Sequence, residues 1–187
     1  MKFKFHLVPV WVLFFGLLAV PFSLQAESQS LVVDGVEDGD TIVVMLNGKQ
    51  ERLQLAGIDA PEDVVNAKLK RDYKVTGLDP QTLRALGLDA TRHLHSLVER
   101  GDTLQIIGRF DRRDRYGRVL VEAIDGAGRS LNEAMVKGGY AVVTRYGAME
   151  AELKVRLKSL ESEAIAYHRG LWGKSRKAAM VWSGYKN

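Results

Sequence analysis

The chain has 187 residues, of which 46% are hydrophobic and 27% are charged, and it contains no cysteine. This balance is ordinary for a globular domain and excludes collagen-like, low-complexity and disordered chains. The absence of cysteine excludes disulfide scaffolds, thiolate zinc sites, iron–sulfur clusters and a cysteine nucleophile. The length predicts one domain with a core of its own, whose chemistry must use oxygen and nitrogen side chains.

The net charge is weakly positive, +4 for the whole chain. Without Lys2 and Lys4, 25 basic residues face 23 acidic ones, which is compatible with an anionic partner but does not demand one. Five arginines lie within residues 109–118. Such a run by itself is typical of a solvated surface.

The first 26 residues have the layout of a secretory signal peptide. A basic start is followed by residues 7–24, which carry no charge, and Ala26 precedes a polar segment. An uncleaved membrane anchor is the alternative, because the apolar run is just long enough to span a bilayer. Two prolines within the run favour cleavage after Ala26. We therefore expect a secreted or periplasmic protein that is not held at a membrane after cleavage.

Two β segments are expected in the part of the chain that follows. Thr41–Leu46 is rich in β-branched residues, an Asn-Gly turn signal comes next, and residues 50–55 alternate between polar and apolar. A second β segment covers residues 103–124, with a hairpin turn at 114–117. Five short strands interrupted by helices predict a small barrel with appended helices, an α+β fold.

Helical periodicity predicts three helices, at residues 89–100, 130–138 and about 148–169. Between residues 62 and 89 lies a long polar stretch with room for a short helix at 81–86, and a connection of this length is usually functional or mobile. The basic tail at 175–187 is expected to fray. The predicted organisation is thus a signal peptide (1–26), one domain (27–174) and this tail.

Two acidic motifs flank the first predicted hairpin: Asp-Gly-Asp-Thr at 38–41 and Asp-Ala-Pro-Glu at 59–62. Pairing of the strands brings Asp40 beside Asp59, with Glu62 just beyond. Clustered carboxylates repel one another unless a cation lies among them, and such oxygen ligands suit Ca²⁺ or Mg²⁺. Taken singly, these aspartates have an alternative interpretation as turn and capping residues.

The arginine-rich segment adds a second component to this acidic cluster. A metal held by carboxylates together with a fixed arginine neutralises charge that develops on a phosphate. A glutamate beside them can orient or deprotonate a water, and the fork of a guanidinium matches phosphate oxygens. Together these residue types indicate phosphodiester hydrolysis.

Five motifs in order resemble those of the staphylococcal nuclease-like (thermonuclease) family, over residues 31–173. The motifs are Asp38-Gly39-Asp40-Thr41, Leu55-Ala56-Gly57-Ile58-Asp59-Ala60-Pro61-Glu62, Asp114-Arg115-Tyr116-Gly117-Arg118, Leu131-Asn132-Glu133-Ala134 and Gly170-Leu171-Trp172. The resemblance implies a five-stranded OB-fold β-barrel with helices. It also implies cleavage of DNA and RNA with Ca²⁺, leaving 3′-phosphate ends.

Roles for individual residues follow from the same resemblance. The carboxylates of Asp40 and Asp59 and the carbonyl of Thr41 are implied ligands of one Ca²⁺ ion. Glu62 matches the proposed general base of the family, and Arg118 matches the arginine that stabilises the phosphorane. Three further residues match nucleotide-binding positions: Tyr116, Arg115 and Tyr146.

One position departs from the family pattern. The other catalytic arginine of the family is expected five residues before the second metal-binding aspartate, where this chain has Gln54. A neutral amide donates a hydrogen bond but carries no charge, and the loss of one such donor costs about 3–4 kcal/mol. Arg52 lies on the same strand face, and we hypothesise that it substitutes imperfectly.

The sequence therefore predicts a Ca²⁺-dependent nuclease with little sequence preference, acting as a monomer on DNA or RNA, single strands above all. A rival of another class is a non-catalytic OB-fold module that binds single-stranded nucleic acid. Gln54 favours this rival. The complete set of Asp40, Asp59, Glu62 and Arg118 argues against it, because binding alone needs no clustered carboxylates.

Overall fold

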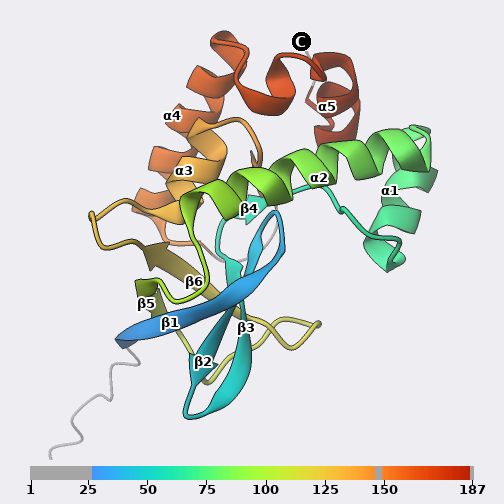
Figure 1. Cartoon of the computed structure of the whole chain (residues 1–187). Helices are drawn as coiled ribbons and strands as arrows, with labels where there is room; N and C mark the ends of the chain where they lie inside the picture. Colours follow the sequence, from blue (N-terminus) through green and yellow to red (C-terminus); the bar gives the residue numbers. More distant parts are fainter. Residues whose placement is uncertain (1–26, 146–148, 186–187) are drawn as a thin grey trace, which may run out of the picture.

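The computed structural model describes residues 27–145 and 149–185. The expected signal peptide and Tyr146 lie outside the described residues. A closed barrel has the strand order β1 (Glu27–Asp38), β2 (Thr41–Leu46), β3 (Lys49–Leu55), β6 (Val119–Ile124) and β5 (Thr103–Gly108). Neighbouring strands are antiparallel except β3 and β6, which are parallel. The predicted five-stranded OB-fold barrel of an α+β protein is confirmed (Figure 1).

The β2–β3 hairpin forms because its turn residues tolerate left-handed backbone angles. Asn47 has φ 51° and Gly48 has φ 75°, which is the geometry that a two-residue turn between twisted strands requires. The resulting register pairs Thr41 with Gln54. The residues on both sides of the predicted acidic cluster are therefore brought to the same end of the barrel.

The helices lie together at one end of the barrel, with α2 (Pro80–Leu97) crossing above the strands (Figure 1). This helix combines the two predicted at 81–86 and 89–100, and it begins at Pro80 after an Asp79 N-cap. The other two predicted helices are present as α3 (Leu131–Lys137) and α4 (Ala151–Ala166).

Two additional helices lie in segments where no helix was predicted. The polar connection contains α1 (Ala67–Thr76), and the basic tail contains α5 (Arg176–Ser183). The expectation of a fraying tail is thus wrong over α5. The helix packs on the 3₁₀ turn η1 (Gly170–Trp172), and the indole Nε1 of Trp182 donates to Asp72 Oδ2 of α1 at 3.2 Å.

The hydrophobic core fills the barrel and continues beneath α2, α3 and α4. A short two-stranded sheet of β4 (Ile58–Asp59) and β7 (Val142–Val143) lies beside it. Fully buried Asn132 of α3 joins these parts: its Nδ2 donates to the carbonyls of Ala56 and Val121, and its Oδ1 accepts from Ala123 N. Because β4 begins two residues after Ala56, this amide helps to fix the strand that carries Asp59.

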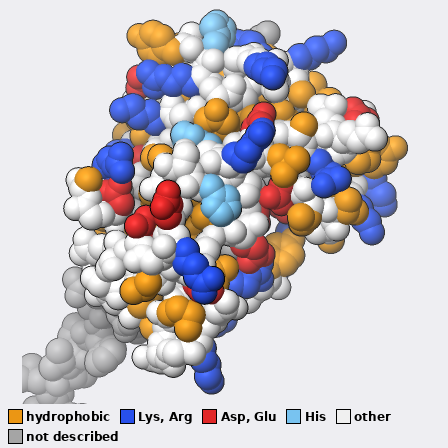
Figure 2. Space-filling view, viewed as in Figure 1, with side chains coloured by type: hydrophobic (Ala, Val, Ile, Leu, Met, Phe, Trp, Pro, Cys, Tyr) orange, Lys and Arg blue, Asp and Glu red, His pale blue; other side chains and the backbone are white. Residues whose placement is uncertain are grey.

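In the face seen in Figure 2, lysine and arginine side chains alternate with acidic ones and do not gather into one basic patch. This distribution agrees with the weak net charge of +4. Among the residues that the structure describes, no helix combines the length and apolar character needed to cross a bilayer.

Candidate active site

The predicted acidic residues lie where the turn between β1 and β2 meets β4. Asp40 is 4% exposed, and its Oδ2 accepts the backbone N–H of Ala60 at 3.0 Å. This contact places Asp40 beside Asp59, as the hairpin pairing predicted. Asp38, the last residue of β1 and two positions earlier, accepts from Asp40 N at 3.0 Å.

Burial and mutual repulsion raise the pKa values of two of these carboxylates, Asp40 and Asp38. Burial raises the pKa of Asp40, and Asp59 raises it further, whereas the positive charges of Lys68 and Arg118 lower it. Burial and the nearby Asp40 raise the pKa of Asp38 to about 7. The cluster is therefore stable in its ionised form only with cations close by.

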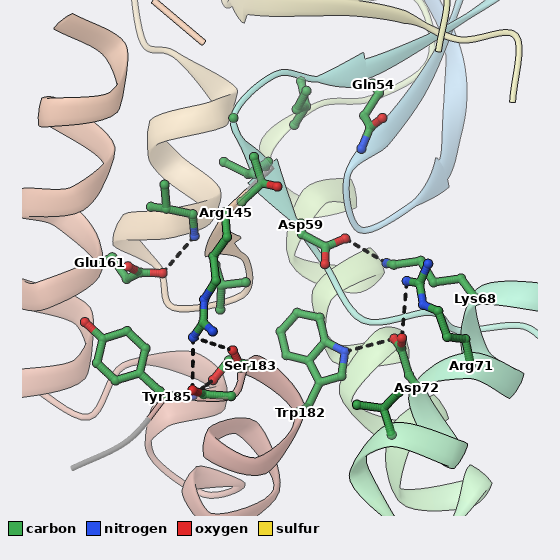
Figure 3. Close-up of a pocket in the computed structure, with 18 of the residues that line it drawn as sticks. Gln54, Asp59, Lys68, Arg71, Asp72, Arg145, Glu161, Trp182, Ser183 and Tyr185 are labelled. Atoms are coloured by element: carbon green, nitrogen blue, oxygen red, sulfur yellow. Dashed lines mark hydrogen bonds and ion pairs between the residues drawn. The ribbon is translucent and has the colours of Figure 1, made fainter. Parts of the chain in front are cut away.

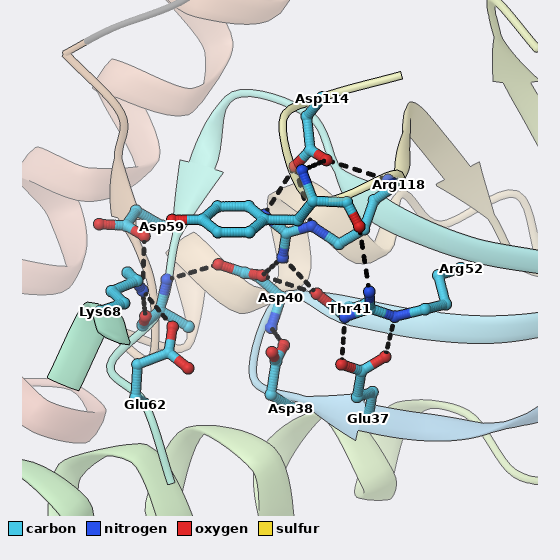
Figure 4. A network of polar contacts seen from close by, with 12 residues as sticks. Glu37, Asp38, Asp40, Thr41, Arg52, Asp59, Glu62, Lys68, Asp114 and Arg118 are labelled. Carbon is cyan, nitrogen blue, oxygen red and sulfur yellow. Dashed lines mark hydrogen bonds and ion pairs between the residues drawn. The ribbon is translucent and has the colours of Figure 1, made fainter. Parts of the chain in front are cut away.

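One of these cations is Lys68 of α1, which the sequence analysis did not identify. Its Nζ lies 2.9 Å from Asp59 Oδ1 and 2.8 Å from Glu62 Oε1, and it donates to the carbonyl of Ala60 at 2.6 Å (Figure 4). Burial alone would lower the pKa of this lysine, but the surrounding carboxylates raise it above its usual value. Nothing in its spacing distinguishes it from the other lysines of the polar connection, because only the fold of α1 brings it to the site.

Glu62, the predicted general base, is positioned by a side-chain hydrogen bond and by a close backbone contact. Its Oε2 accepts from the side-chain amide of Asn66, which is also the N-cap of α1 through a 2.9 Å bond to Leu69 N. Its backbone packs directly on α2 at Gly87, where a Cβ would lie 2.3 Å from the Glu62 carbonyl carbon. The side chain is 10% exposed, so Glu62 is a positioned, largely enclosed carboxylate.

The other cation of the cluster, Arg118, lies immediately before β6. Its Nη1 donates to Thr41 Oγ1 at 2.9 Å and lies 3.4 Å from Asp40 Oδ1, while its Nε donates to Asp114 Oδ2 at 2.9 Å (Figure 4). The side chain is 12% exposed. Asp114 lies in the predicted hairpin turn, and in the structure it also orients the arginine.

The residues predicted around Arg118 take different positions. Arg115 and Arg118 place their guanidinium carbons 4.8 and 5.2 Å from the ring centre of Tyr116, which is 45% exposed. Gln54 projects into the adjoining groove (Figure 3). Arg52 forms an ion pair with Glu37 and donates to the carbonyl of Tyr116 at 3.3 Å. Its guanidinium is therefore already engaged outside the acidic cluster.

A groove of about 1060 Å³ runs from these residues to the C-terminal helix (Figure 3). Its far end is lined by α1 and α5. There, Arg145 Nη2 donates to the carbonyls of Ser183 and Gly184 at 3.1 and 3.0 Å. Residues along its length include Gln54, Asp59, Lys68, Arg71, Arg115, Tyr116, Arg118, Arg145, Lys158 and Trp182. The groove thus joins the acidic cluster to arginines, lysines and aromatic rings.

The donor chemistry of the cluster fits a hard cation such as Ca²⁺, because Asp40, Asp59 and the Thr41 carbonyl offer only oxygen. The ammonium of Lys68 lies among the carboxylates as a stand-in for such an ion, which shows that this position accepts positive charge. Within residues 27–145 and 149–185, no three acidic or histidine side chains are arranged together around a metal position. Oxygen donors for Ca²⁺ are present, but Lys68 pairs with one of them.

Comparison with known proteins agrees with this geometry. The family model described as Staphylococcal nuclease homologue matches residues 52–174. An Escherichia coli protein named as an uncharacterized endonuclease is 36% identical over 137 residues, which are 73% of this chain and 72% of that protein.

Two further relatives have similar names. Endonuclease YncB of Bacillus subtilis is 28% identical over 152 residues, 81% of this chain and 65% of its own. A thermonuclease of Staphylococcus hyicus is 29% identical over 149 residues, 79% of this chain and 78% of its own. The protein with this barrel and acidic cluster belongs to the staphylococcal nuclease family.

Proposed function

We propose that the protein is an endonuclease that hydrolyses phosphodiester bonds of DNA and RNA in a Ca²⁺-dependent reaction. The observation that carries this proposal is the placement of Arg118 and Glu62 on either side of buried Asp40 (Figure 4), next to the groove that Arg118 and Asp59 line. A binding protein has no need to keep these carboxylates together, because their repulsion costs stability.

Each residue has a defined task in this reaction. Glu62 accepts a proton from the attacking water or orients it; Asn66 fixes its carboxylate, and the close packing on Gly87 fixes its backbone. Arg118 presents a guanidinium, held by Asp114, to the phosphate oxygens as negative charge develops on them.

Ca²⁺ would be held by the Asp40 and Asp59 carboxylates and the Thr41 carbonyl, and it supplies further neutralisation of phosphate charge when bound. Support comes from the oxygen-only donor set and from the relative named thermonuclease.

The groove supports a single strand as the preferred substrate. Tyr116 exposes part of its ring beside Arg115, an arrangement that suits an unpaired base and its phosphate. Such contacts depend on base stacking and phosphate charge, which all nucleotides share, so little sequence preference is expected. We expect the protein to act as a monomer. The role predicted for Tyr146 stays a prediction.

We also propose that the chain is exported through its first 26 residues and acts in the periplasm or outside the cell. The basic start, the uncharged run and the small residue Ala26 support this.

A second candidate function is a nucleic-acid-binding module that does not cleave. It is favoured by Gln54, which lies where an arginine is expected, and by Arg52, which is paired with Glu37 instead of reaching the acidic cluster. The two candidates differ in whether a bound strand is cut.

The test is cleavage of end-labelled single-stranded DNA and RNA by the purified protein, with Ca²⁺ and with chelator. We expect Ca²⁺-dependent cleavage that is lost in Glu62→Gln and unchanged in the exposed control Glu99→Gln. Binding without cleavage in both conditions would contradict the nuclease and favour the binding module.

A further inference from the structure

Lys68 lies in the first turn of α1, inside the stretch that connects the acidic motif to α2. An ammonium has three N–H donors and no acceptor. Here all three have a partner: the carboxylates of Asp59 and Glu62 and the carbonyl of Ala60, at 2.9, 2.8 and 2.6 Å. No donor is left for solvent, which is unusual for a lysine.

This arrangement differs from the surface ion pairs of the molecule. The side chain of Lys68 is 15% exposed and that of Glu62 is 10% exposed, so both charges have lost most of their water. Such a pair persists only with good geometry and complete hydrogen bonding. Lys70, two residues further along α1, is by contrast exposed.

The position of α1 is fixed at its N-terminus and near its middle. Asn66 caps its first turn and donates to Glu62, while Asp72 accepts from Trp182 of α5. The ammonium is therefore delivered to the carboxylates by a helix with tertiary contacts of its own, and not by a freely rotating surface side chain.

We propose that Lys68 is the resident counter-ion of the active-site carboxylates in the metal-free protein, and that Ca²⁺ binds only when this ammonium withdraws from Asp59. The inference rests on the proposed function, since it takes Asp40 and Asp59 as the Ca²⁺ ligands. Two cations cannot share one carboxylate position without strong repulsion. The stability of the Lys68 contacts thus sets the Ca²⁺ concentration at which the site is filled.

Withdrawal of Lys68 also changes the surroundings of Glu62. In the structure, Lys68 and Asn66 contact the two oxygens of Glu62. When Lys68 leaves, Oε1 becomes available to a water molecule. Ion binding and release of the general base are therefore one event, which keeps the metal-free enzyme inactive.

The experiment is calorimetric titration of Ca²⁺ into the chelator-treated protein, with no nucleic acid present. Wild type is compared with Lys68→Gln, Lys68→Met and the exposed control Lys70→Gln. We expect the Kd for Ca²⁺ to fall about tenfold or more in both Lys68 variants and to stay unchanged in Lys70→Gln.

Thermal unfolding supplies a second readout. Lys68→Gln keeps a donor for the Ala60 carbonyl but leaves the carboxylates without their cation, so its Tm without Ca²⁺ should lie below that of wild type. Added Ca²⁺ should raise the Tm of this variant more than that of wild type, because it binds the folded state more tightly. In wild type, saturating Ca²⁺ should accelerate amide hydrogen exchange in Ala67–Thr76.

Equal or weaker Ca²⁺ binding by the Lys68 variants would overturn the proposal, even if cleavage proves to need Ca²⁺ and the proposed function holds. Cleavage by wild type in chelator that is lost in Lys68→Gln would also overturn it, by showing that the ammonium replaces the ion permanently. If wild type and variants all fail to bind Ca²⁺, both the inference and the Ca²⁺ dependence fall.

Discussion

The side chain of Asp114 holds Arg118 from four residues away, with 2.9 Å between Asp114 Oδ2 and Arg118 Nε. The other oxygen accepts the backbone N–H groups of Tyr116 and Arg118 at 2.8 and 2.9 Å. Partial burial raises the pKa of Asp114, but these donors hold it below its usual value, so the carboxylate is charged. One residue thus shapes the turn and orients the arginine that faces the phosphate.

Replacement of Asp114 by asparagine should lower kcat about tenfold with a smaller change in KM. The amide oxygen can still accept the two backbone N–H groups, but the amide NH2 cannot accept from Arg118, so the charge-assisted bond is lost, and such bonds are worth about 1.5–3 kcal/mol. Steady-state cleavage of a short labelled oligonucleotide measures both constants. Asp111→Asn in the same loop is the control, because Asp111 pairs with Arg109 at the surface. Equal kcat in Asp114→Asn and wild type would show that Arg118 needs no such support.

Gly87→Ala should reduce activity although alanine is the better helix former. A Cβ at this position of α2 would lie 2.3 Å from the carbonyl carbon of Glu62, so the segment that carries the general base must move. We expect kcat to fall at least about tenfold, since catalysis is sensitive to displacements near 1 Å. Gly126→Ala is the matched control, because a Cβ there meets nothing within 4 Å. A variant that folds and cleaves like wild type would show that Glu62 is not positioned by this contact.

Gln54→Arg should increase kcat about tenfold to a hundredfold. Gln54 pairs with Thr41 across the hairpin and faces the groove, so a guanidinium there would be a second charged donor for the phosphate. Single-turnover cleavage with saturating enzyme separates this gain from tighter binding. The companion variant Arg52→Ala tests the hypothesis that Arg52 takes over the role of the arginine expected at position 54. A loss of kcat supports the hypothesis, whereas unchanged kcat would show that Arg52 has no such role.

The sequence was sufficient to predict the barrel, because alternation in the strands and the Asn-Gly turn determine the β2–β3 register that brings Asp40 to Asp59. Local signals of this kind act over a few residues. A local signal also sets the start of α3, where the hydroxyl of Ser130, the first residue of the predicted helix, accepts from Glu133 N.

The sequence was not sufficient where a contact depends on distant elements. Lys68 and Trp182 occur in polar or basic segments without a clear apolar pattern, and both are positioned by packing between α1 and α5. Asp114 could be recognised as a turn residue but not as the partner of Arg118, because the fold decides where the arginine points. The same is true of Gly87, whose role is set by the approach of Glu62.

Asn132→Leu should lower the free energy of unfolding by at least about 2 kcal/mol. The amide is fully buried and makes three hydrogen bonds, and each buried partner that is left unsatisfied costs about 1–3 kcal/mol. Urea unfolding followed by circular dichroism gives the difference. Gln81→Leu, at an exposed position of α2, is the control and should change stability little. A stable Asn132→Leu variant would mean that leucine packing compensates for the lost bonds.

The last prediction concerns pH and His93, whose ring stacks on Tyr140 with 4.2 Å between centroids. Burial lowers the pKa of this histidine, although the backbone of Ala134 opposes the effect. Below pH 6.5 the unfolded chain takes up a proton at His93 more readily than the folded protein, so this residue makes stability fall as the solution is acidified.

His93→Gln should therefore lose less stability than wild type between pH 7.5 and about 5.5, as measured by urea unfolding at each pH. His95→Gln is the matched control, because His95 is exposed on the same helix and should follow wild type. Asp38, whose pKa is raised to about 7, contributes with the opposite sign but equally in all three proteins, so it cancels in the comparison. Parallel stability profiles for wild type and His93→Gln would show that the stacked ring is protonated without cost.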